Sequence, residues 1–441
     1  MLARRPGAGV GWAKAVLACA LTLSGNAWAS DEPRCAVKAG TLIDGSGGPP
    51  AHNVWIVVEG DRIKAVAPGE APAGLPIIDL GDSTVLPGFI DMHTHLTSPL
   101  VGEPGWDMAA VREGPADLAL QGAFHARQAL EAGFTTVREV GAFGFSDVSL
   151  RNAISKGWVL GPRMVVSAHA IGATGGHCDT SGFLPNLFGR EPGIAEGIAN
   201  GADEVRSAVR YQAKYGADWI KVCATGGVIS SGDAIGQQQY SAEELKAAAD
   251  TAHLLGRRIA AHAHSTDGIK AAVRAGFDSI EHGSFLDDEA IRLMLEHKTF
   301  LVSTLMAGDA VGRMAKDGVL TGEYAAKARI VAPAMPKSLA RASAAGVKVA
   351  LGTDNIFDPH PSDAREYGLL VAAGLSPMQA ILAGSRTAAE LLGWQKDVGA
   401  VAPGAYADLV AVRGNPLDDI HVLEHVRFVM KGGRVVRNDA P

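Results

Sequence analysis

The pattern of hydrophobic and polar residues divides the chain into two β-rich ends and a long middle with a different rhythm. Residues 53–67 form two short runs of mainly apolar residues around a turn at residues 60–61, which is typical of a β-hairpin. Residues 408–412 and 426–436 repeat this pattern at the other end. We therefore expect residues 30–86 and 401–441 to pair into one small β-domain.

The middle of the chain, residues 87–400, alternates short apolar runs with amphipathic stretches. Residues 259–261 and 347–351 are examples of apolar runs, and residues 242–255 have helical periodicity. Such alternation predicts parallel βαβ units. About eight units over roughly 300 residues suit a (β/α)₈ TIM barrel of the α/β class. A doubly wound open sheet is the alternative, but no Gly-x-Gly-x-x-Gly follows the first strand to support a dinucleotide site.

Residues 1–29 are expected to be a signal peptide and not part of the fold. Basic residues precede a short apolar run at 15–23, and the small residues of Ala27-Trp28-Ala29 fit a cleavage site before Ser30. The apolar run is too short to span a bilayer. We therefore expect an exported, periplasmic or secreted, protein with no stable membrane span; an uncleaved anchor is the alternative.

The charge balance excludes one class of partner. The chain carries 40 Lys and Arg against 47 Asp and Glu, a net charge of −7, and no basic stripe. A nucleic-acid partner is therefore not expected.

Removal of the signal peptide would leave Cys35, Cys178 and Cys223, which allow at most one internal disulfide. The hydrophobic core must therefore stabilise the fold.

Two histidines in residues 88–95 are the first candidates for chemistry. Side chains at alternate positions of a strand share a face, so Asp91, His93 and His95 are expected to point the same way. Neighbouring imidazoles at a strand end can bind one cation. Buried histidines without a ligand are the alternative for this pair.

Further candidate ligands also lie at the C-terminal ends of predicted strands, and the strands of a parallel barrel would end at a common mouth. They are His262, His264, His282, Asp354 and Lys221. Imidazoles and a carboxylate suit Zn²⁺, or Mn²⁺, Co²⁺ or Fe²⁺. An ammonium group cannot bind a metal. However, CO₂ can add to the neutral amine of Lys221, and the resulting carbamate could bridge two cations; an ordinary salt bridge is the alternative.

These motifs resemble those of the amidohydrolase superfamily over nearly all of the mature chain. Residues 87–96, 261–265, 280–283 and 351–355 resemble its metal motifs, and residues 399–410 are similar to the closing motif of its β-domain. The resemblance implies a distorted (β/α)₈ barrel with a small β-sandwich built from both termini. It also implies two Zn²⁺ or similar ions, held by His93, His95 and Asp354, by His262 and His282, and by a bridging N6-carboxylysine at Lys221.

The resemblance also implies a mechanism for amide hydrolysis. Two cations lower the pKa of a bridging water, so that a hydroxide attacks the amide at neutral pH. Asp354 would accept the proton and pass it to the leaving amine. His264 is the alternative to His262 as the ligand after the fifth strand, and otherwise would face the substrate.

Residues 174–177, 219–228 and 278–283 are similar to the Xaa-Pro dipeptidase-like carboxypeptidase branch. This likeness implies release of a C-terminal amino acid from small-molecule substrates, namely dipeptides or N-acyl amino acids, with ochratoxin A among the candidates. It also implies a homo-oligomer such as an octamer. The alternatives are hydrolysis of cyclic amides or other C–N bonds, and an exported zinc-binding protein without activity. Lys221 argues against a one-metal imidazolonepropionase-like enzyme, and Asp354 argues against a protein without activity.

The free carboxylate of such a substrate requires hydrogen-bond donors. His177, Tyr240 and Arg138 are the candidates, and each has a purely structural role as its alternative. Cys178 follows His177 where the family pattern has a small residue. Its loop is expected near that of Cys223, so the two cysteines are hypothesised to lie close together. Two buried free thiols are favoured over a disulfide.

Overall fold

The computed structural model describes residues 34–184, 187 and 189–439. The expected signal peptide, residues 1–29, lies outside the described residues. In the described part of the chain, no helix combines the length and the apolar character needed to cross a membrane.

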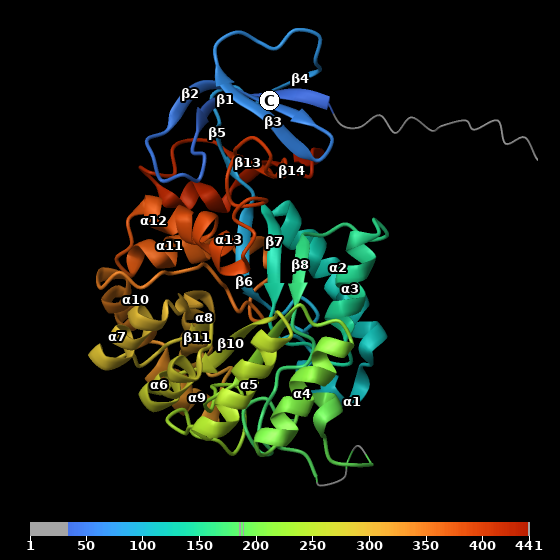
Figure 1. Cartoon of the computed structure of the whole chain (residues 1–441), viewed down its shortest axis with the longest axis vertical. Helices are drawn as coiled ribbons and strands as arrows, with labels where there is room; N and C mark the ends of the chain where they lie inside the picture. The colour runs from blue at the N-terminus through green and yellow to red at the C-terminus, as the bar shows by residue number, and fades with distance from the viewer. Residues whose placement is uncertain (1–33, 185–186, 188, 440–441) are drawn as a thin grey trace, which may run out of the picture. The chain divides into compact units, whose positions relative to one another are not determined.

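Strands from the two ends of the chain form one eight-stranded sheet (Figure 1). The N-terminal strands are β1 (Arg34–Leu42), β2 (Ala51–Glu59), β3 (Arg62–Pro68), β4 (Ile77–Asp79) and β5 (Thr84–Pro87), and the C-terminal strands are β13 (Leu409–Val412), β14 (Val426–Lys431) and β15 (Arg434–Asn438). Antiparallel pairing of β13 with β5 joins the two sets. Alternate residues of these strands, such as Val37, Ile56 and Phe428, pack into a separate core.

Seven parallel strands form two groups in the middle of the chain. One group is β6 (Phe89–Thr94), β7 (Phe134–Glu139) and β8 (Arg163–Val166), and the other is β9 (Trp219–Cys223), β10 (Arg258–Ala263), β11 (Ser279–His282) and β12 (Phe300–Val302).

Single bridges and hydrogen bonds close these two groups into a ring. Ile171, which follows β8, forms a bridge with Val222 of β9 and so joins the two groups. At the other side, Leu301 of β12 forms a bridge with Val349. The amide of Met92 in β6 then donates to the carbonyl of Leu351 at 2.9 Å. Residues 347–351 therefore take the place of an irregular eighth strand. The fold is the distorted (β/α)₈ barrel with a small β-sandwich domain that the sequence predicts.

Helices connect the barrel strands and cover the ring (Figure 1). They are α1 (Ala109–Arg112), α2 (Pro115–Glu131), α3 (Ser146–Ser155), α4 (Ala202–Lys214), α5 (Ala242–Leu254), α6 (Thr266–Ala275), α7 (Asp288–His297), α8 (Leu305–Lys316), α9 (Gly322–Val331), α10 (Met335–Ala344), α11 (Arg365–Ala372), α12 (Pro377–Ala383) and α13 (Arg386–Leu392). Local sequence sets their ends. Helix α5 begins with a capping box of Ser241 and Glu244, and α6 ends at Gly276, whose φ of +98° favours glycine.

Candidate metal centre and active-site cavity

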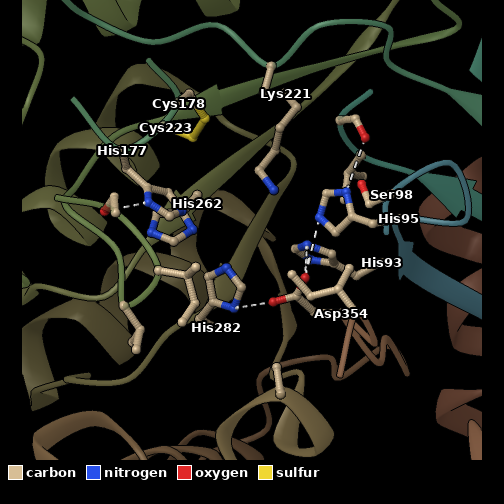
Figure 2. Close-up of a pocket in the computed structure, with 18 of the residues that line it drawn as sticks. His93, His95, Ser98, His177, Cys178, Lys221, Cys223, His262, His282 and Asp354 are labelled. Atoms are coloured by element: carbon tan, nitrogen blue, oxygen red, sulfur yellow. Dashed lines mark hydrogen bonds and ion pairs between the residues drawn. A yellow bond between two sulfur atoms is a disulfide. The ribbon is translucent and has the colours of Figure 1, made fainter. Parts of the chain in front are cut away.

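A cavity of about 400 Å³ opens where the barrel strands end (Figure 2). All six metal ligands predicted from the sequence line it: His93, His95, Lys221, His262, His282 and Asp354. They come from the ends of β6, β9, β10 and β11 and from the turn after residues 347–351. The parallel strands therefore bring together residues that are distant in the sequence.

One candidate ligand group surrounds Asp354. Its Oδ1 lies 3.5 Å from Nε2 of His93 and 3.3 Å from Nε2 of His95, and its Oδ2 lies 3.9 Å from Nδ1 of His282. Burial alone would raise the pKa of this carboxyl, but the three imidazoles outweigh burial and hold the pKa below its ordinary value. Asp354 is therefore a carboxylate with three imidazoles nearby, a set of donors that suits a divalent cation.

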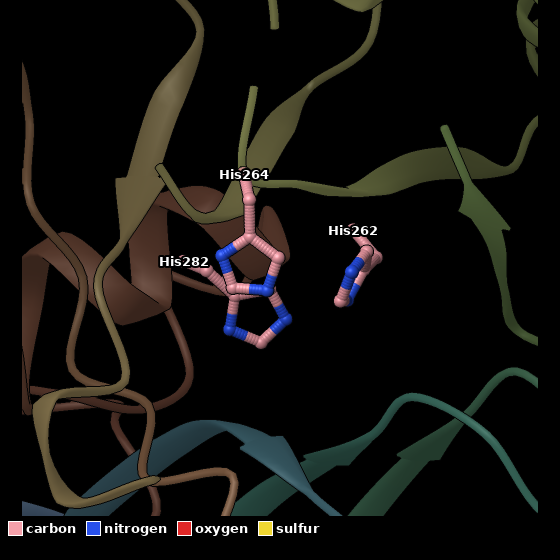
Figure 3. Close-up of side chains that lie close together, drawn as sticks. All are labelled: His262, His264 and His282. Carbon is pink, nitrogen blue, oxygen red and sulfur yellow. The ribbon is translucent and has the colours of Figure 1, made fainter. Parts of the chain in front are cut away.

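A second candidate group consists of His262, His264 and His282, whose nearest ligand atoms all lie within 4.8 Å of one another (Figure 3). Both His262 and His264 line the cavity, so both remain candidates for the ligand after the fifth strand. The ring of His264 stacks on that of His282 with 4.8 Å between centroids. His282 contributes to both groups and therefore lies where two cations would be closest.

Hydrogen bonds orient the imidazoles from behind the cavity. Nδ1 of His93 lies 2.8 Å from Oε2 of Glu281, and Nδ1 of His95 lies 3.1 Å from the carbonyl of Gly141. Two more rings follow the same pattern: Nδ1 of His264 lies 2.7 Å from Oγ of Ser284, and Nδ1 of His282 lies 2.8 Å from Oγ1 of Thr304. His262 differs, because its Nε2 lies 3.3 Å from the carbonyl of Gly226.

In the four rings held through Nδ1, Nε2 is the nitrogen available to a ligand, and a ring fixed through its other nitrogen is the usual arrangement of metal-binding histidines. In His262 the available nitrogen is Nδ1. Burial lowers the pKa of His93 to about 4 and that of His282 well below its ordinary value, so both rings are neutral and keep a free lone pair. The donor set therefore fits divalent metal ions.

Lys221 extends its amine from β9 into the cavity between the two ligand groups (Figure 2). The residue is 4% exposed, and burial lowers the pKa of its amine to about 8, although Glu281 and Asp354 oppose the shift. Among the described residues, no carboxylate oxygen lies within salt-bridge distance of this amine, so the structure does not support the salt-bridge alternative.

The backbone is strained at three positions around the cavity. His282, Thr304 and Asp354 have φ values of +71°, +50° and +50°, in the left-handed region that residues other than glycine rarely adopt. Each of these positions lies at the end of a strand or in the turn after it. Strained non-glycine residues persist where the surrounding structure fixes them, and such positions cluster at active sites.

Two of the four predicted substrate contacts lie in the cavity and two do not. His177 and His264 line the cavity. Arg138, in contrast, is fully buried and donates to the carbonyl of Met92 at 2.6 Å and to Oε1 of Glu281 at 2.7 Å. The hydroxyl of buried Tyr240 donates to the carbonyl of Ala199 at 2.9 Å. The contacts of Arg138 and Tyr240 are therefore structural, which corrects the expectation that they bind a substrate carboxylate.

The expectation that Asp91 shares the cavity face with His93 is wrong. Its carboxylate accepts hydrogen bonds from Oγ1 of Thr353 at 2.7 Å and from the amide of His93 at 2.9 Å. Burial, with a contribution from Asp363, raises the pKa of Asp91 to about 7. Asp91 therefore links β6 to the turn in which Asp354 lies. It does not line the cavity.

Cys178 and Cys223 are joined by a disulfide, with 5.9 Å between their Cα atoms. The expectation of two free thiols is therefore wrong. The bridge fastens the loop that carries His177 to the end of β9, two residues after Lys221. Cys35 is a free, buried cysteine.

Sequence reasoning missed the residues that hold the ligands, among them Glu281, Ser284 and Thr304. The best signal was Glu281, a charged residue directly before His282 in a short segment expected to be a barrel strand. A charge at such a position requires a buried partner. Serine and threonine after a strand gave no comparable signal, because they are common in turns.

The chain matches the Amidohydrolase family model over residues 84–436. It is 32% identical to ochratoxinase from Aspergillus niger over an alignment of 443 residues, which covers 92% of this chain and 88% of the relative. A crystal structure of a Xaa-Pro dipeptidase with bound methionine superposes with a TM-score of 0.87 at 37% identity, covering 91% of this chain and 99% of the other.

The crystal structure of A. niger ochratoxinase superposes with a TM-score of 0.81 at 31% identity, covering 92% of this chain and 96% of the other. The family match, the relative and the two solved structures agree on the family. The chain belongs to the amidohydrolase family and is a hydrolase.

Proposed function

We propose that the protein is a binuclear-metal hydrolase that releases the C-terminal amino acid from dipeptides or N-acyl amino acids. The observation that carries the proposal is the pair of candidate ligand groups on either side of the Lys221 amine in one cavity. Similarity to a Xaa-Pro dipeptidase and to ochratoxinase supports the substrate class.

His93, His95 and Asp354 would hold one cation, and His282 with His262 or His264 would hold the other. Zn²⁺ is the proposed ion because imidazoles and a carboxylate suit it, and Mn²⁺, Co²⁺ and Fe²⁺ share this ligand preference. Lys221 would bridge the cations as N6-carboxylysine. A pKa of about 8 supports this modification, because CO₂ adds only to the neutral amine.

Bound cations would lower the pKa of a water and polarise the scissile carbonyl. The chain itself supplies the proton acceptor. Asp354 is held as a carboxylate by the surrounding imidazoles, so one of its oxygens can take a proton and then deliver it to the leaving amine.

One wall of the cavity is apolar and supports a preference for an apolar substrate side chain. Helices α8, α9 and α10 contribute Ala307, Val311, Val331 and Met335, and Phe357 adds an aromatic ring. A cavity of about 400 Å³ is within the range that binds small ligands, roughly 300–1,000 Å³. We therefore propose that phenylalanine-like residues are released, and ochratoxin A, which would yield phenylalanine, is included among the candidate substrates.

The experiment is turnover by the zinc-loaded chain on N-acetyl-phenylalanine, ochratoxin A and Xaa-Phe, Xaa-Leu, Xaa-Pro and Xaa-Arg dipeptides. We expect release of the C-terminal amino acid, fastest for Xaa-Phe and Xaa-Leu, and its loss in Lys221→Met. Absence of release across the panel, with two metals bound, would contradict the proposal and would favour cyclic amides or other C–N bonds.

We also propose that the protein is exported. The disulfide between Cys178 and Cys223 supports this proposal, since disulfides persist mainly in oxidising compartments. Fractionation of producing cells, followed by sequencing of the mature N-terminus, tests it. A chain that begins at Ser30 in the exported fraction is expected, and a full-length chain retained in the cytoplasm would contradict export.

A further inference from the structure

The imidazole of His177 is held rigidly in the cavity wall (Figure 2). Its ring lies against that of His262, with 4.1 Å between centroids. On another side is Gly227, where a Cβ atom would lie only 2.1 Å from Cε1 of the imidazole. Only glycine leaves space for the ring at this position. The neighbouring Cys178 is fixed by its disulfide to Cys223.

A chain of buried polar groups leads away from this ring to helix α9. Nδ1 of His177 lies 2.9 Å from Oγ of Ser230. That hydroxyl donates to Oδ1 of Asp233 at 2.7 Å, and the amine of Lys327 donates to the same oxygen at 2.7 Å. Lys327 also donates to the carbonyl of Ser230 at 2.7 Å. The Asp233 and Lys327 side chains are only 2% and 10% exposed.

The same carboxylate also holds the backbone of His177. Oδ2 of Asp233 accepts from Nε2 of Gln239 at 3.2 Å, and Oε1 of Gln239 accepts from the amide of His177 at 3.0 Å. The amide of Gly227 donates to Oδ2 of Asp233 at 3.1 Å. Asp233 therefore fixes both the ring and the main chain of His177, along with the glycine on which the ring rests.

The directions of these hydrogen bonds determine which nitrogen of His177 carries the proton. Asp233 is a carboxylate and only accepts, because Lys327 and Ser230 outweigh the effect of burial on its pKa. The single hydroxyl proton of Ser230 is used in the short, charge-assisted bond to Asp233. The lone pair of Ser230 then accepts from Nδ1–H of His177, and Nε2 of His177 is left without a proton.

We infer that Lys327, Asp233 and Ser230 are positioning residues that fix His177 with Nε2 as an acceptor for the N–H of the scissile amide. This inference rests on the proposed function. It replaces the expectation that His177 donates to a substrate carboxylate. The contact with His262, a candidate metal ligand, places the ring beside the reacting bond instead of at the far end of the substrate. In the described part of the chain, His177 makes its hydrogen bonds through its amide and through Nδ1, and Nε2 has no protein partner.

The inference makes a prediction about the amide itself, because an amide to proline has no N–H. Ser230→Ala should lower kcat/KM for N-acetyl-phenylalanine by about 10- to 100-fold, the usual effect of removing a supporting hydrogen bond at a metal site. The same variant should lower kcat/KM for N-acetyl-proline far less, because that substrate has no N–H for Nε2 to accept. Ser230→Thr keeps the hydroxyl and should retain activity on both substrates. Equal losses on both substrates in Ser230→Ala, or no loss on either, would overturn the inference.

A second measurement does not depend on turnover and separates this inference from the proposed function. Nitrogen-15 NMR of histidine-labelled protein, with His177→Asn to assign the signal, reports which ring nitrogen is protonated. We expect Nδ1–H in the native chain and in Ser230→Thr, and a changed signal in Ser230→Ala. A proton on Nε2 in the native chain would overturn the inference. If neither substrate is hydrolysed while the Nδ1–H signal is present, the proposed function fails and the positioning of His177 stands.

Discussion

Nδ1 of His93 lies 2.8 Å from Oε2 of Glu281, which joins β6 to β11 across the centre of the barrel. The other oxygen of Glu281 accepts from Arg138 at 2.7 Å, and all three side chains are buried. Burial alone would raise the pKa of Glu281, but Arg138 and His93 together lower it to about 2. The carboxylate therefore stays ionised and orients a candidate metal ligand.

Replacing Glu281 is expected to weaken both the fold and the metal site. Glu281→Gln leaves the Arg138 charge buried without its partner, which should cost about 3–5 kcal/mol in the free energy of unfolding. Denaturant unfolding of the metal-free chain measures this loss. Glu390→Gln, which breaks the exposed pair of Lys348 and Glu390, is the matched control and should cost only about 0–1 kcal/mol. Equal effects of the two variants would contradict the role given to Glu281.

The stability of the metal-free chain should depend on the titration of Lys221. Its pKa is about 8 in the folded chain against an ordinary value of 10.5, so the unfolded chain binds more protons between these pH values. Stability due to this residue therefore rises as pH increases from about 8 to 10.5. Denaturant unfolding across this pH range should show a smaller rise in Lys221→Met than in the native chain. The control Lys348→Met alters an exposed lysine and should follow the native curve. A Lys221→Met curve parallel to the native one would show that the amine is not perturbed.

The disulfide should contribute to stability and to the geometry of the cavity. Its partners are 45 residues apart, and closing a loop of this length stabilises a fold by about 4 kcal/mol in the chain-entropy model. The double variant Cys178→Ser, Cys223→Ser should therefore unfold at lower denaturant concentration and lose activity, because the loop that carries His177 is released. Cys35→Ser, at the free cysteine, should keep its activity. Full activity of the double variant would show that the bridge does not position His177.

The barrel, and the gathering of the candidate ligands around one cavity, could be predicted because each depends on a local pattern. Residues 242–255 were expected to be helical, and α5 spans Ala242–Leu254. His93 and His282 each follow an apolar run, and parallel strands place such positions at one mouth. Contacts between distant segments of the chain have no local pattern in the sequence from which they could be predicted. The pairing of Arg138 with Glu281, and of Asp233 with Lys327, depends on how the strands and α9 pack.

Arg138 shows why the substrate contacts were harder to predict than the ligands. A lone arginine near a strand end fits either a substrate anchor or a buried ion pair, and only the contact of Arg138 in β7 with Glu281 in β11 decides between them. The prediction that the Asp91 side chain faces the cavity was wrong for a related reason. Strand alternation predicts a shared face, but the turn at Thr353 supplies donors that draw the carboxylate away from the cavity.

The apolar wall should set the preference for the released amino acid. Val311 is buried in α8 and lines the cavity, so Val311→Phe narrows the apolar side. We expect kcat/KM for N-acetyl-phenylalanine to fall by about 10-fold or more, as over-filling a packed site costs about 1–3 kcal/mol. N-acetyl-alanine should be affected less. Val319→Phe, at an exposed position, is the control. Equal losses on both substrates would place the released side chain elsewhere.

Stepwise metal loading shows whether two cations in this cavity together hydrolyse an amide. The metal-free chain is titrated with Zn²⁺ in bicarbonate buffer, and metal content and release of phenylalanine from N-acetyl-phenylalanine are measured on the same samples. We expect the release of phenylalanine to increase with the second equivalent of Zn²⁺ and to reach its maximum at two ions per chain. Asp354→Asn should release no phenylalanine at any metal loading. Full activity at one ion per chain, or two bound ions with no release, would contradict the account.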